Sequence, residues 1–170
     1  MKTLVKQRPF AAVDWNQMVL MVLGFWLSAS FLLDAVIVPV LFSTGMMAEQ
    51  GFISAGYVLF GVFNRLELVC SALVLTAFIG FWQQNKFGDR RSLNALVIAS
   101  VLFNIALIST YALTPQISGW GLEMETMTAI PTMPDAMIWL HGLYWTFELA
   151  KLGLGLTLWR WCYQKNCAIA

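Results

Sequence analysis

Four apolar runs, at about residues 16–43, 52–82, 93–114 and 136–161, divide this sequence. The hydrocarbon core of a bilayer is about 30 Å thick, so a helix of about 20 apolar residues crosses it. In that core every backbone polar group must be paired within the protein, and a helix pairs them within its own segment. The runs therefore predict an all-α fold, an integral membrane four-helix bundle in which residues 1–170 form a single transmembrane domain.

The composition supports a membrane protein and argues against several classes of function. Hydrophobic residues make up 59% of the chain and charged residues 11%, against about 25% charged residues in a typical soluble domain. The three cysteines show no metal-binding spacing, and no phosphate-binding loop, zinc pattern or nucleophile motif is present. We expect contact with the lipid bilayer, other membrane proteins or a second copy as partners, and no nucleic acid.

Lysine and arginine are distributed unevenly along the chain. Eight of the ten lie at one end of the predicted bundle, at Lys2, Lys6, Arg8, Lys86, Arg90, Arg91, Arg160 and Lys165. The connection over residues 115–135, at the other end, holds three acids and neither Lys nor Arg. Cationic segments stay on the cytoplasmic side of a membrane. The sequence therefore predicts cytoplasmic termini (N-in/C-in), an external loop at 115–135, and insertion in a bacterial cytoplasmic (inner) membrane or a thylakoid.

The first run, over residues 16–43, is longer than the core of a signal peptide, and we predict that it is a retained helix. Pro39 lacks a backbone N–H and is expected to bend this helix. Gly24 and Ser28 are four residues apart, and they predict a face of small residues on which another helix packs closely.

Polar side chains interrupt the four runs, and we predict that they form a buried network: Asp34, Asn64, Arg65, Glu67, Asn104, His141, Glu148 and Lys151. An ionisable group in the middle of a membrane costs about 3 kcal/mol on insertion scales, so such groups usually face the bundle interior. Glu148 and Lys151 are three residues apart on one helix, a spacing that permits an ion pair. His141 and Glu148 are seven residues apart and share a face of that helix.

The expected pairing follows from the depth of each group along its run. Asp34 and Arg65 lie at similar depths, and we expect them to pair. Lys151 is the only lysine within the four runs, and we expect it to pair with Glu148. Glu67 is then the carboxyl group without a cation. We predict that Glu67 keeps a proton and donates a hydrogen bond to Asn104. Such a network either fixes the helix packing or forms a proton, ion or redox site.

His141 is also a candidate metal ligand. Met137 lies one helical turn before it, and Met133 lies in the adjoining external connection. Thioether sulfur suits Cu(I), and imidazole binds copper or haem iron. The alternative is that the histidine is simply hydrogen-bonded and that the methionines fill irregular apolar space. The cofactor predicted under the metal-binding interpretation is copper or haem.

Three strings resemble a known family: GFWLSASFLLDAVIVPVLF, GYVLFGVFNRLELV and HGLYWTFELAKLGLGL. They look like a bacterial four-span membrane family of unknown function, common in cyanobacteria and related to the CopD-like membrane bundles. The resemblance implies a four-helix integral membrane protein with no assigned activity. The CopD-like relatives include copper-handling and haem-binding members that use several histidines, whereas this chain has one.

We expect a non-enzymatic accessory or interaction protein of a bacterial membrane, in which the buried charges hold the helices together. One alternative is copper or haem binding or transport through His141 and the methionines in or beside the external linkers: Met46, Met47, Met124, Met127, Met133 and Met137. Another is a membrane oxidoreductase or a proton pathway through Glu67 and Glu148, although no cofactor motif accompanies these residues.

Overall fold

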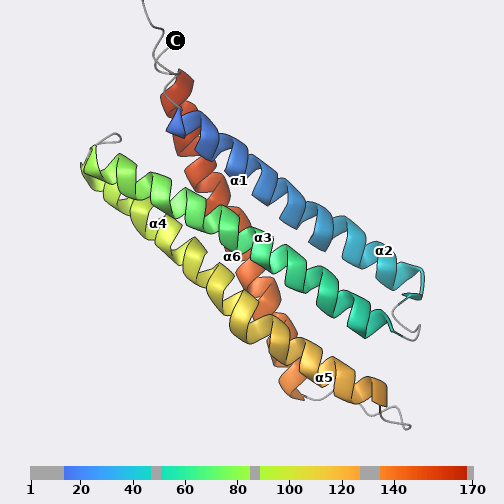
Figure 1. Ribbon diagram of the computed structural model, residues 1–170. Coiled ribbons are helices and arrows are strands. Elements are labelled where there is room, and N and C mark those ends of the chain that lie inside the picture. Colours follow the sequence, from blue (N-terminus) through green and yellow to red (C-terminus); the bar gives the residue numbers. More distant parts are fainter. Residues whose placement is uncertain (1–13, 47–50, 85–88, 127–134, 168–170) are drawn as a thin grey trace, which may run out of the picture.

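The computed structural model describes residues 14–46, 51–84, 89–126 and 135–167, and within these ranges the fold is all-α with no sheet. Four helical rods run along the molecule (Figure 1). The elements in chain order are α1 (Trp15–Leu32), η1 (Leu33–Ile37), α2 (Val38–Ser43), α3 (Phe52–Gln83), α4 (Asp89–Ile108), η3 (Ser109–Leu113), α5 (Thr114–Thr126) and α6 (Asp135–Cys167). The prediction of an all-α four-helix fold is confirmed.

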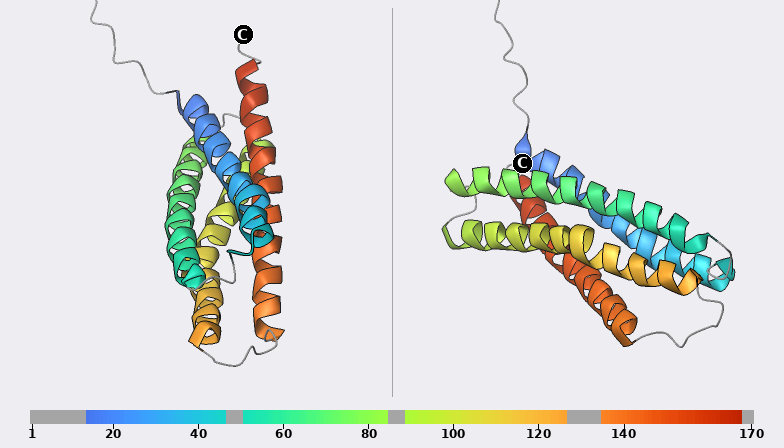
Figure 2. Two further views of the ribbon diagram at one scale, coloured as in Figure 1. Left: turned by 90° about the vertical axis from the view of Figure 1, so that its right-hand side faces the viewer. Right: turned by 60° about the horizontal axis from the view of Figure 1, so that its bottom comes forward.

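The rods pack as a ring in which each has two neighbours. α1 packs against α3 and α6, and α4 packs against the same two helices. Figure 2 shows α6 crossing the other rods at an angle. We call the end where α1 and α4 begin and α6 ends the termini end, and the opposite end the distal end. Since α3 and α6 are not neighbours in this ring, contacts between their side chains cross the middle of the bundle.

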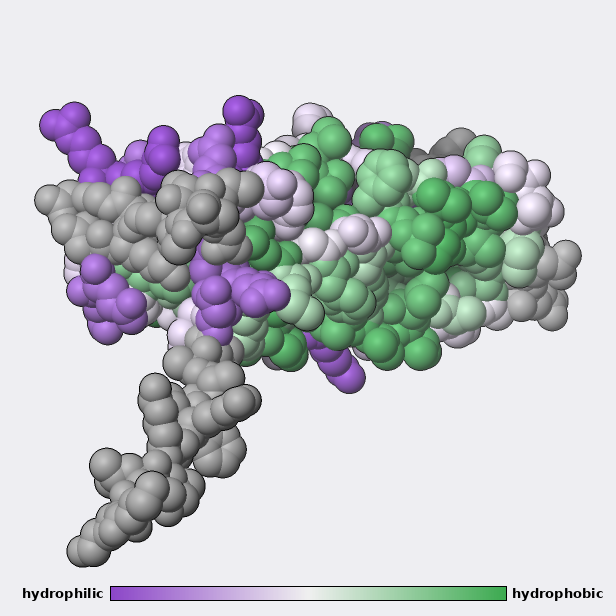
Figure 3. Space-filling view, turned by 90° about the horizontal axis from the view of Figure 1, so that it is seen from above, coloured by the Kyte–Doolittle hydropathy of each residue, from purple (hydrophilic) through white to green (hydrophobic). Residues whose placement is uncertain are grey.

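Three of the rods are long and apolar enough to cross a membrane: Trp15–Ser43, Phe52–Gln83 and Arg90–Glu123. They correspond to the first three predicted spans. α6 has 33 residues, but it carries four charged residues in its central and final turns, at Glu148, Lys151, Arg160 and Lys165. Figure 3 shows hydrophobic residues over the middle and the distal part of one face, with hydrophilic residues gathered at the termini end. The protein is therefore a helical protein with membrane-spanning segments.

Two wide helical turns of the π type, η1 and η3, interrupt the rods, and a proline follows each of them. The N–H of Val38 bonds to the carbonyl of Leu33, and that of Thr114 bonds to the carbonyl of Ser109, five residues back in both cases. The next residue is Pro39 in one rod and Pro115 in the other. A proline ring collides with the carbonyl four residues before it in a regular α-helix, so a wider turn lets the helix continue.

The wide turn η3 before Pro115 corrects one sequence-based expectation. The external loop was expected to begin at residue 115, but the helix continues through Pro115 as α5 and ends at Thr126. Residues 127–134 of that connection lie outside the described ranges. At Pro39 the expected disturbance of the helix is present as the turn η1.

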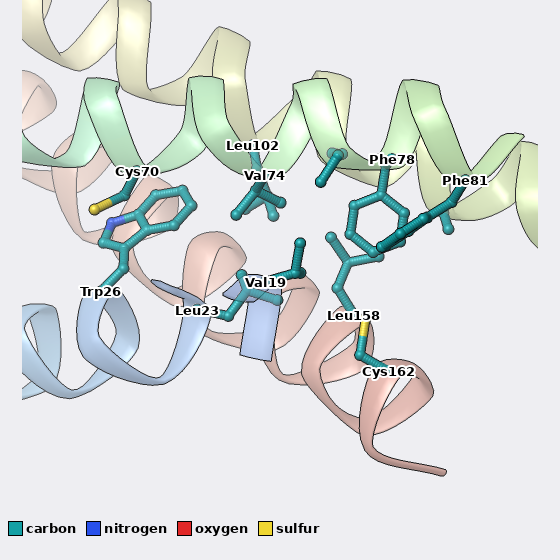
Figure 4. Packing of buried hydrophobic residues seen from close by; sticks show 13 residues of the cluster. Val19, Leu23, Trp26, Cys70, Val74, Phe78, Phe81, Leu102, Leu158 and Cys162 are labelled. Carbon is teal, nitrogen blue, oxygen red and sulfur yellow. The ribbon is translucent and has the colours of Figure 1, made fainter. Parts of the chain in front are cut away.

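The apolar core occupies the half of the bundle near the termini end (Figure 4). It contains Val19, Leu23, Trp26, Cys70, Val74, Phe78, Phe81, Leu102, Leu158 and Cys162. Toward the distal end the packing is looser, because α2 has no buried residue and α3 has none before Asn64. The two ends of the polar network therefore meet different surroundings, a closed apolar core on one side and half-exposed side chains on the other.

α1 and α6 approach each other closely at Gly155. A Cβ atom added there would lie 2.6 Å from Leu27 Cδ2. The predicted face of small residues is wrong in its position, since a Cβ at Gly24 would meet only Trp159 Nε1 at 3.7 Å and Ser28 is exposed.

Candidate functional site

A lysine between two glutamates forms the centre of the polar network. Lys151 Nζ, on α6, lies 2.6 Å from Oε2 and 2.7 Å from Oε1 of Glu67 on α3. The same nitrogen lies 2.6 Å from Oε1 of Glu148, one turn earlier on α6. The exposed fraction of each of these three side chains is 3% or less. The expected pair of Glu148 with Lys151 is present, and it is joined by a second glutamate.

Glu67 is an acceptor for every polar group around it. Its Oε1 accepts from Trp26 Nε1 at 3.0 Å and from Ser30 Oγ at 2.9 Å, both on α1. Together with Lys151, donors from two helices reach this one carboxyl group. An ionised carboxylate accepts hydrogen bonds only, so this geometry fits a Glu67 carboxylate. Asn104 is not among these partners, so the predicted hydrogen bond from Glu67 to Asn104 is wrong.

Asp34 extends the network toward the distal end. It lies in η1, where its Oδ1 accepts a hydrogen bond of 3.1 Å from the hydroxyl of Tyr144 on α6. The Asp34 and Glu148 carboxyl groups are hydrogen-bonding neighbours. Asp34 Oδ2 and Glu148 Oε2 are buried and receive no donor from the part of the chain that the structure describes. The network thus runs from Glu67 through Lys151 and Glu148 to Asp34.

Two predicted members of the network lie outside it. Arg65 is exposed on α3, so its predicted pair with Asp34 is wrong, and within the described ranges Arg65 takes part in no ion pair. Asn104 is also exposed, and its amide donates to the carbonyl of Ser100 on its own helix at 2.8 Å. Helix rotation decides this: Arg65 and Glu67 are about 200° apart around α3, so burial of Glu67 turns Arg65 outward.

Asn64 is buried, but it joins a separate contact. Its Nδ2 donates to Thr114 Oγ1 at 2.5 Å, and Thr110 Oγ1 donates to the Asn64 carbonyl at 3.3 Å. These bonds tie α3 to the segment around Pro115. Asn64 therefore helps to fix the helices that surround the charged network.

The candidate metal ligands are not gathered into a site in the described ranges. His141 is half-buried, and its Nδ1 lies 2.9 Å from the carbonyl oxygen of Met137, so one ring nitrogen is used within the helix. Met133 lies outside the described residues. Within those residues no group of three His, Cys, Asp or Glu side chains is placed to hold a metal ion. No observation here favours copper or haem at His141.

Three members of the network were not predicted: Trp26, Ser30 and Tyr144. A periodic signal was present in the sequence. Trp26, Ser30 and Asp34 follow one another at intervals of four on the first rod, which places them on one helix face. Tyr144 precedes Glu148 by four residues on α6 in the same way. A search along the face of each buried acid would have found these donors.

A comparison of the chain with models of protein families, with curated proteins and with solved structures finds no match. The functional argument therefore depends on the geometry of the molecule itself.

Proposed function

We propose that this protein is a non-enzymatic accessory protein of a bacterial membrane that binds another membrane protein through the face of α3 around Arg65. In this proposal it crosses the membrane four times with both termini in the cytoplasm, as the distribution of Lys and Arg favours. The buried charged network holds its helices together. Membership of the four-span bacterial family that its strings resemble is part of the proposal.

The surface of α6 supports a fourth crossing. Its two central charged residues, Glu148 and Lys151, are buried in the bundle, so they would not meet lipid. The large residues exposed on this helix are mostly apolar or aromatic, among them Ile138, Trp139, Leu143, Leu149 and Leu156. The mean hydropathy of the whole helix includes the buried charged residues, whereas a bilayer contacts only the exposed face of the helix.

Arg65 is the observation that carries the binding proposal. It is exposed on a helix that can cross a membrane, between Val62 and Val69, whose exposed fractions are 63% and 58%. It lies 13 residues after the first residue of α3, a distance of about 20 Å along the helix. An arginine near the middle of a bilayer costs about 3 kcal/mol on insertion scales and almost always faces protein or water. Such a face is suited to a protein partner rather than to lipid.

The charge of Arg65 defines the partner. A transmembrane helix with an aspartate or glutamate at the same depth would pair with the guanidinium group in two hydrogen bonds. A second copy of this chain does not offer that group. Two parallel copies related by a two-fold axis would bring Arg65 toward Arg65, and the exposed acids of the described ranges lie near helix ends, as Asp14, Glu123 and Asp135 do. The occupant is therefore a different membrane protein.

Photo-crosslinking in cells tests this proposal. A photoreactive residue at Val62 or Val69 should give one discrete heterologous product, and Arg65→Gln should abolish it. Positions Val97 and Val101, exposed on α4, serve as matched controls and should give none. A product that forms equally well with Arg65→Gln, or the lack of any product from Val62 and Val69, would contradict the proposal.

A further inference from the structure

The buried charges of the network do not balance. Within the described ranges the buried charged residues are Asp34, Glu67, Glu148 and Lys151. Three carboxyl groups thus share one ammonium group, and with every group ionised two negative charges would have no partner. Uncompensated charge in a low-dielectric interior is strongly disfavoured, and a carboxyl group in that position takes up a proton instead.

The donors around each carboxyl group indicate where a proton belongs. Both oxygens of Glu67 are reached by Lys151, and Oε1 also accepts from Trp26 and Ser30. A proton on Glu67 would therefore compete with donors that already occupy its oxygens. Asp34 and Glu148 differ, because each has one oxygen with a donor and one without.

The two oxygens without a donor belong to carboxyl groups that are neighbours. Asp34 Oδ2 and Glu148 Oε2 are both buried, their residues are 6% and 3% exposed, and the two carboxyl groups are within hydrogen-bonding reach. Two ionised carboxylates in that arrangement would repel each other. One proton between them supplies a donor for one oxygen and an acceptor for the other. It removes both unsatisfied atoms and one unit of negative charge at once.

We propose that Asp34 and Glu148 share one proton, held between Asp34 Oδ2 and Glu148 Oε2, and that the bundle thus contains a buried proton-binding site. On binding, an O–H bond forms on one carboxyl oxygen and the other oxygen accepts a hydrogen bond from it. Tyr144 fixes Asp34 through Oδ1, and Lys151 fixes Glu148 through Oε1. These contacts leave Asp34 Oδ2 and Glu148 Oε2 as the two oxygens available for the proton.

The groups that surround this pair come from α6 itself and from one further element, α3. α6 contributes Tyr144 and Lys151, and α3 contributes Glu67. Arg65 faces outward and does not compensate the pair. On the termini side the apolar cluster closes the bundle, whereas on the distal side Tyr144 is only half-buried and its ring contacts Phe60 edge-on at 6.2 Å. The distal side of the pair is therefore the less closed of the two.

Infrared spectroscopy of the full-length protein in nanodiscs tests the proposal. At neutral pH the unmodified protein should show the C=O stretching band of a protonated carboxyl group. Asp34→Asn and Glu148→Gln should each remove it, because the amide N–H then supplies the hydrogen between the two groups. Asp135→Asn, which changes an exposed acid, should leave the band unchanged. Lack of the band in the unmodified protein, or its persistence in both buried variants, would overturn the proposal.

Site-resolved ¹³C NMR of the unmodified protein gives an answer that needs no variant to fold. The side-chain carboxyl resonance of Asp34 or of Glu148, or an average of both, should have the shift of a protonated acid. Two ionised carboxyl resonances would overturn the proposal. If Na⁺ or K⁺ then also raised the melting temperature by mass action, a cation rather than a proton would lie between the two groups.

Discussion

Lys151 of α6 and Glu67 of α3 meet in the middle of the bundle, 2.6 Å apart, although their helices are not neighbours in the ring. The pair therefore ties the two opposite helices together, while Trp26 and Ser30 attach α1 to the same carboxyl group. Three of the four rods thus depend on one glutamate. Such a contact acts on the relative depth and rotation of the helices, which apolar packing alone specifies weakly in a membrane.

The roles of Glu67 and Asp34 predict different responses to amide substitution. Glu67→Gln should destabilise the protein strongly, because it removes the anion of a buried ion pair and places an amide N–H among donors. Loss of one partner of a buried pair costs about 3–5 kcal/mol. Asp34→Asn should cost much less, since the amide can replace the shared proton. Melting temperatures in one detergent compare the two variants, and equal losses would contradict the assignment.

The sequence predicted the helices and the local pair well, but not the contacts across the bundle. The ion pair of Glu148 with Lys151 depends on a spacing of three residues in one helix, and this spacing is visible in any helical sequence. Glu67 with Lys151 depends on how α3 and α6 are rotated, which no local pattern determines. The predicted pair of Asp34 with Arg65 depended only on their similar depths along the helices. The rotation of α3 places Arg65 on the exposed face, so this pair does not form.

The two prolines show a second limit of the sequence analysis. The external loop was predicted to begin at Pro115, and proline in a regular helix removes a hydrogen bond and causes a clash. The turn η3 adds one residue before it and relieves the clash, so the helix continues into α5. The same device at Pro39 holds Asp34 in the turn η1, which is a position that a regular α-helix would not give.

Trp26→Phe should reduce stability through one lost hydrogen bond. The substitution keeps an aromatic ring in the apolar cluster but removes the N–H that donates to Glu67 Oε1. Glu67 Oε1 keeps its donors Ser30 and Lys151, and one hydrogen bond to a charged group contributes about 1.5–3 kcal/mol. Trp139→Phe, at a side chain that is 79% exposed, is the control and should have little effect. A melting temperature that falls equally in both variants would show that loss of ring size, not of the bond, is responsible.

Gly155→Ala and Gly153→Ala should change stability in opposite directions. Alanine is favoured over glycine within a helix by about 0.5–1 kcal/mol, and a Cβ at Gly153 meets nothing within 4 Å. At Gly155 the new methyl group would lie 2.6 Å from Leu27 Cδ2 and 3.4 Å from Cγ, so α1 and α6 must move apart or Leu27 must repack. Thermal unfolding of the two variants checks this, and a stabilised Gly155→Ala would contradict the close packing.

Tyr144→Phe tests the distal part of the network. Without the phenol hydroxyl, Asp34 Oδ1 loses its donor, and the bond is worth about 1 kcal/mol. The protonated carboxyl band should remain but move in frequency, because the group that carries the proton is bonded differently. Tyr163→Phe changes an exposed ring on the same helix and should leave the band in place. An unshifted band in Tyr144→Phe would separate this tyrosine from the proton-binding pair.

The number of crossings depends on α6, which is not among the three helices of the described ranges that are long and apolar enough to cross a membrane. If burial in the bundle keeps Glu148 and Lys151 away from lipid, α6 can cross the membrane. Its two ends should then lie on opposite sides. Single cysteines at Ala136 and Tyr163, exposed near the two ends, should then react with a membrane-impermeant maleimide from opposite sides.

Cysteines at Ser54 and Gln84, near the two ends of α3, provide the reference for a helix that crosses. Ala136 should react from the same side as Ser54, and Tyr163 from the same side as Gln84, because the two helices share the distal and termini ends of one bundle. The native cysteines Cys70, Cys162 and Cys167 must be replaced by serine or alanine first. Reaction of the cysteines at Ala136 and Tyr163 from the same side would show that α6 does not cross the membrane.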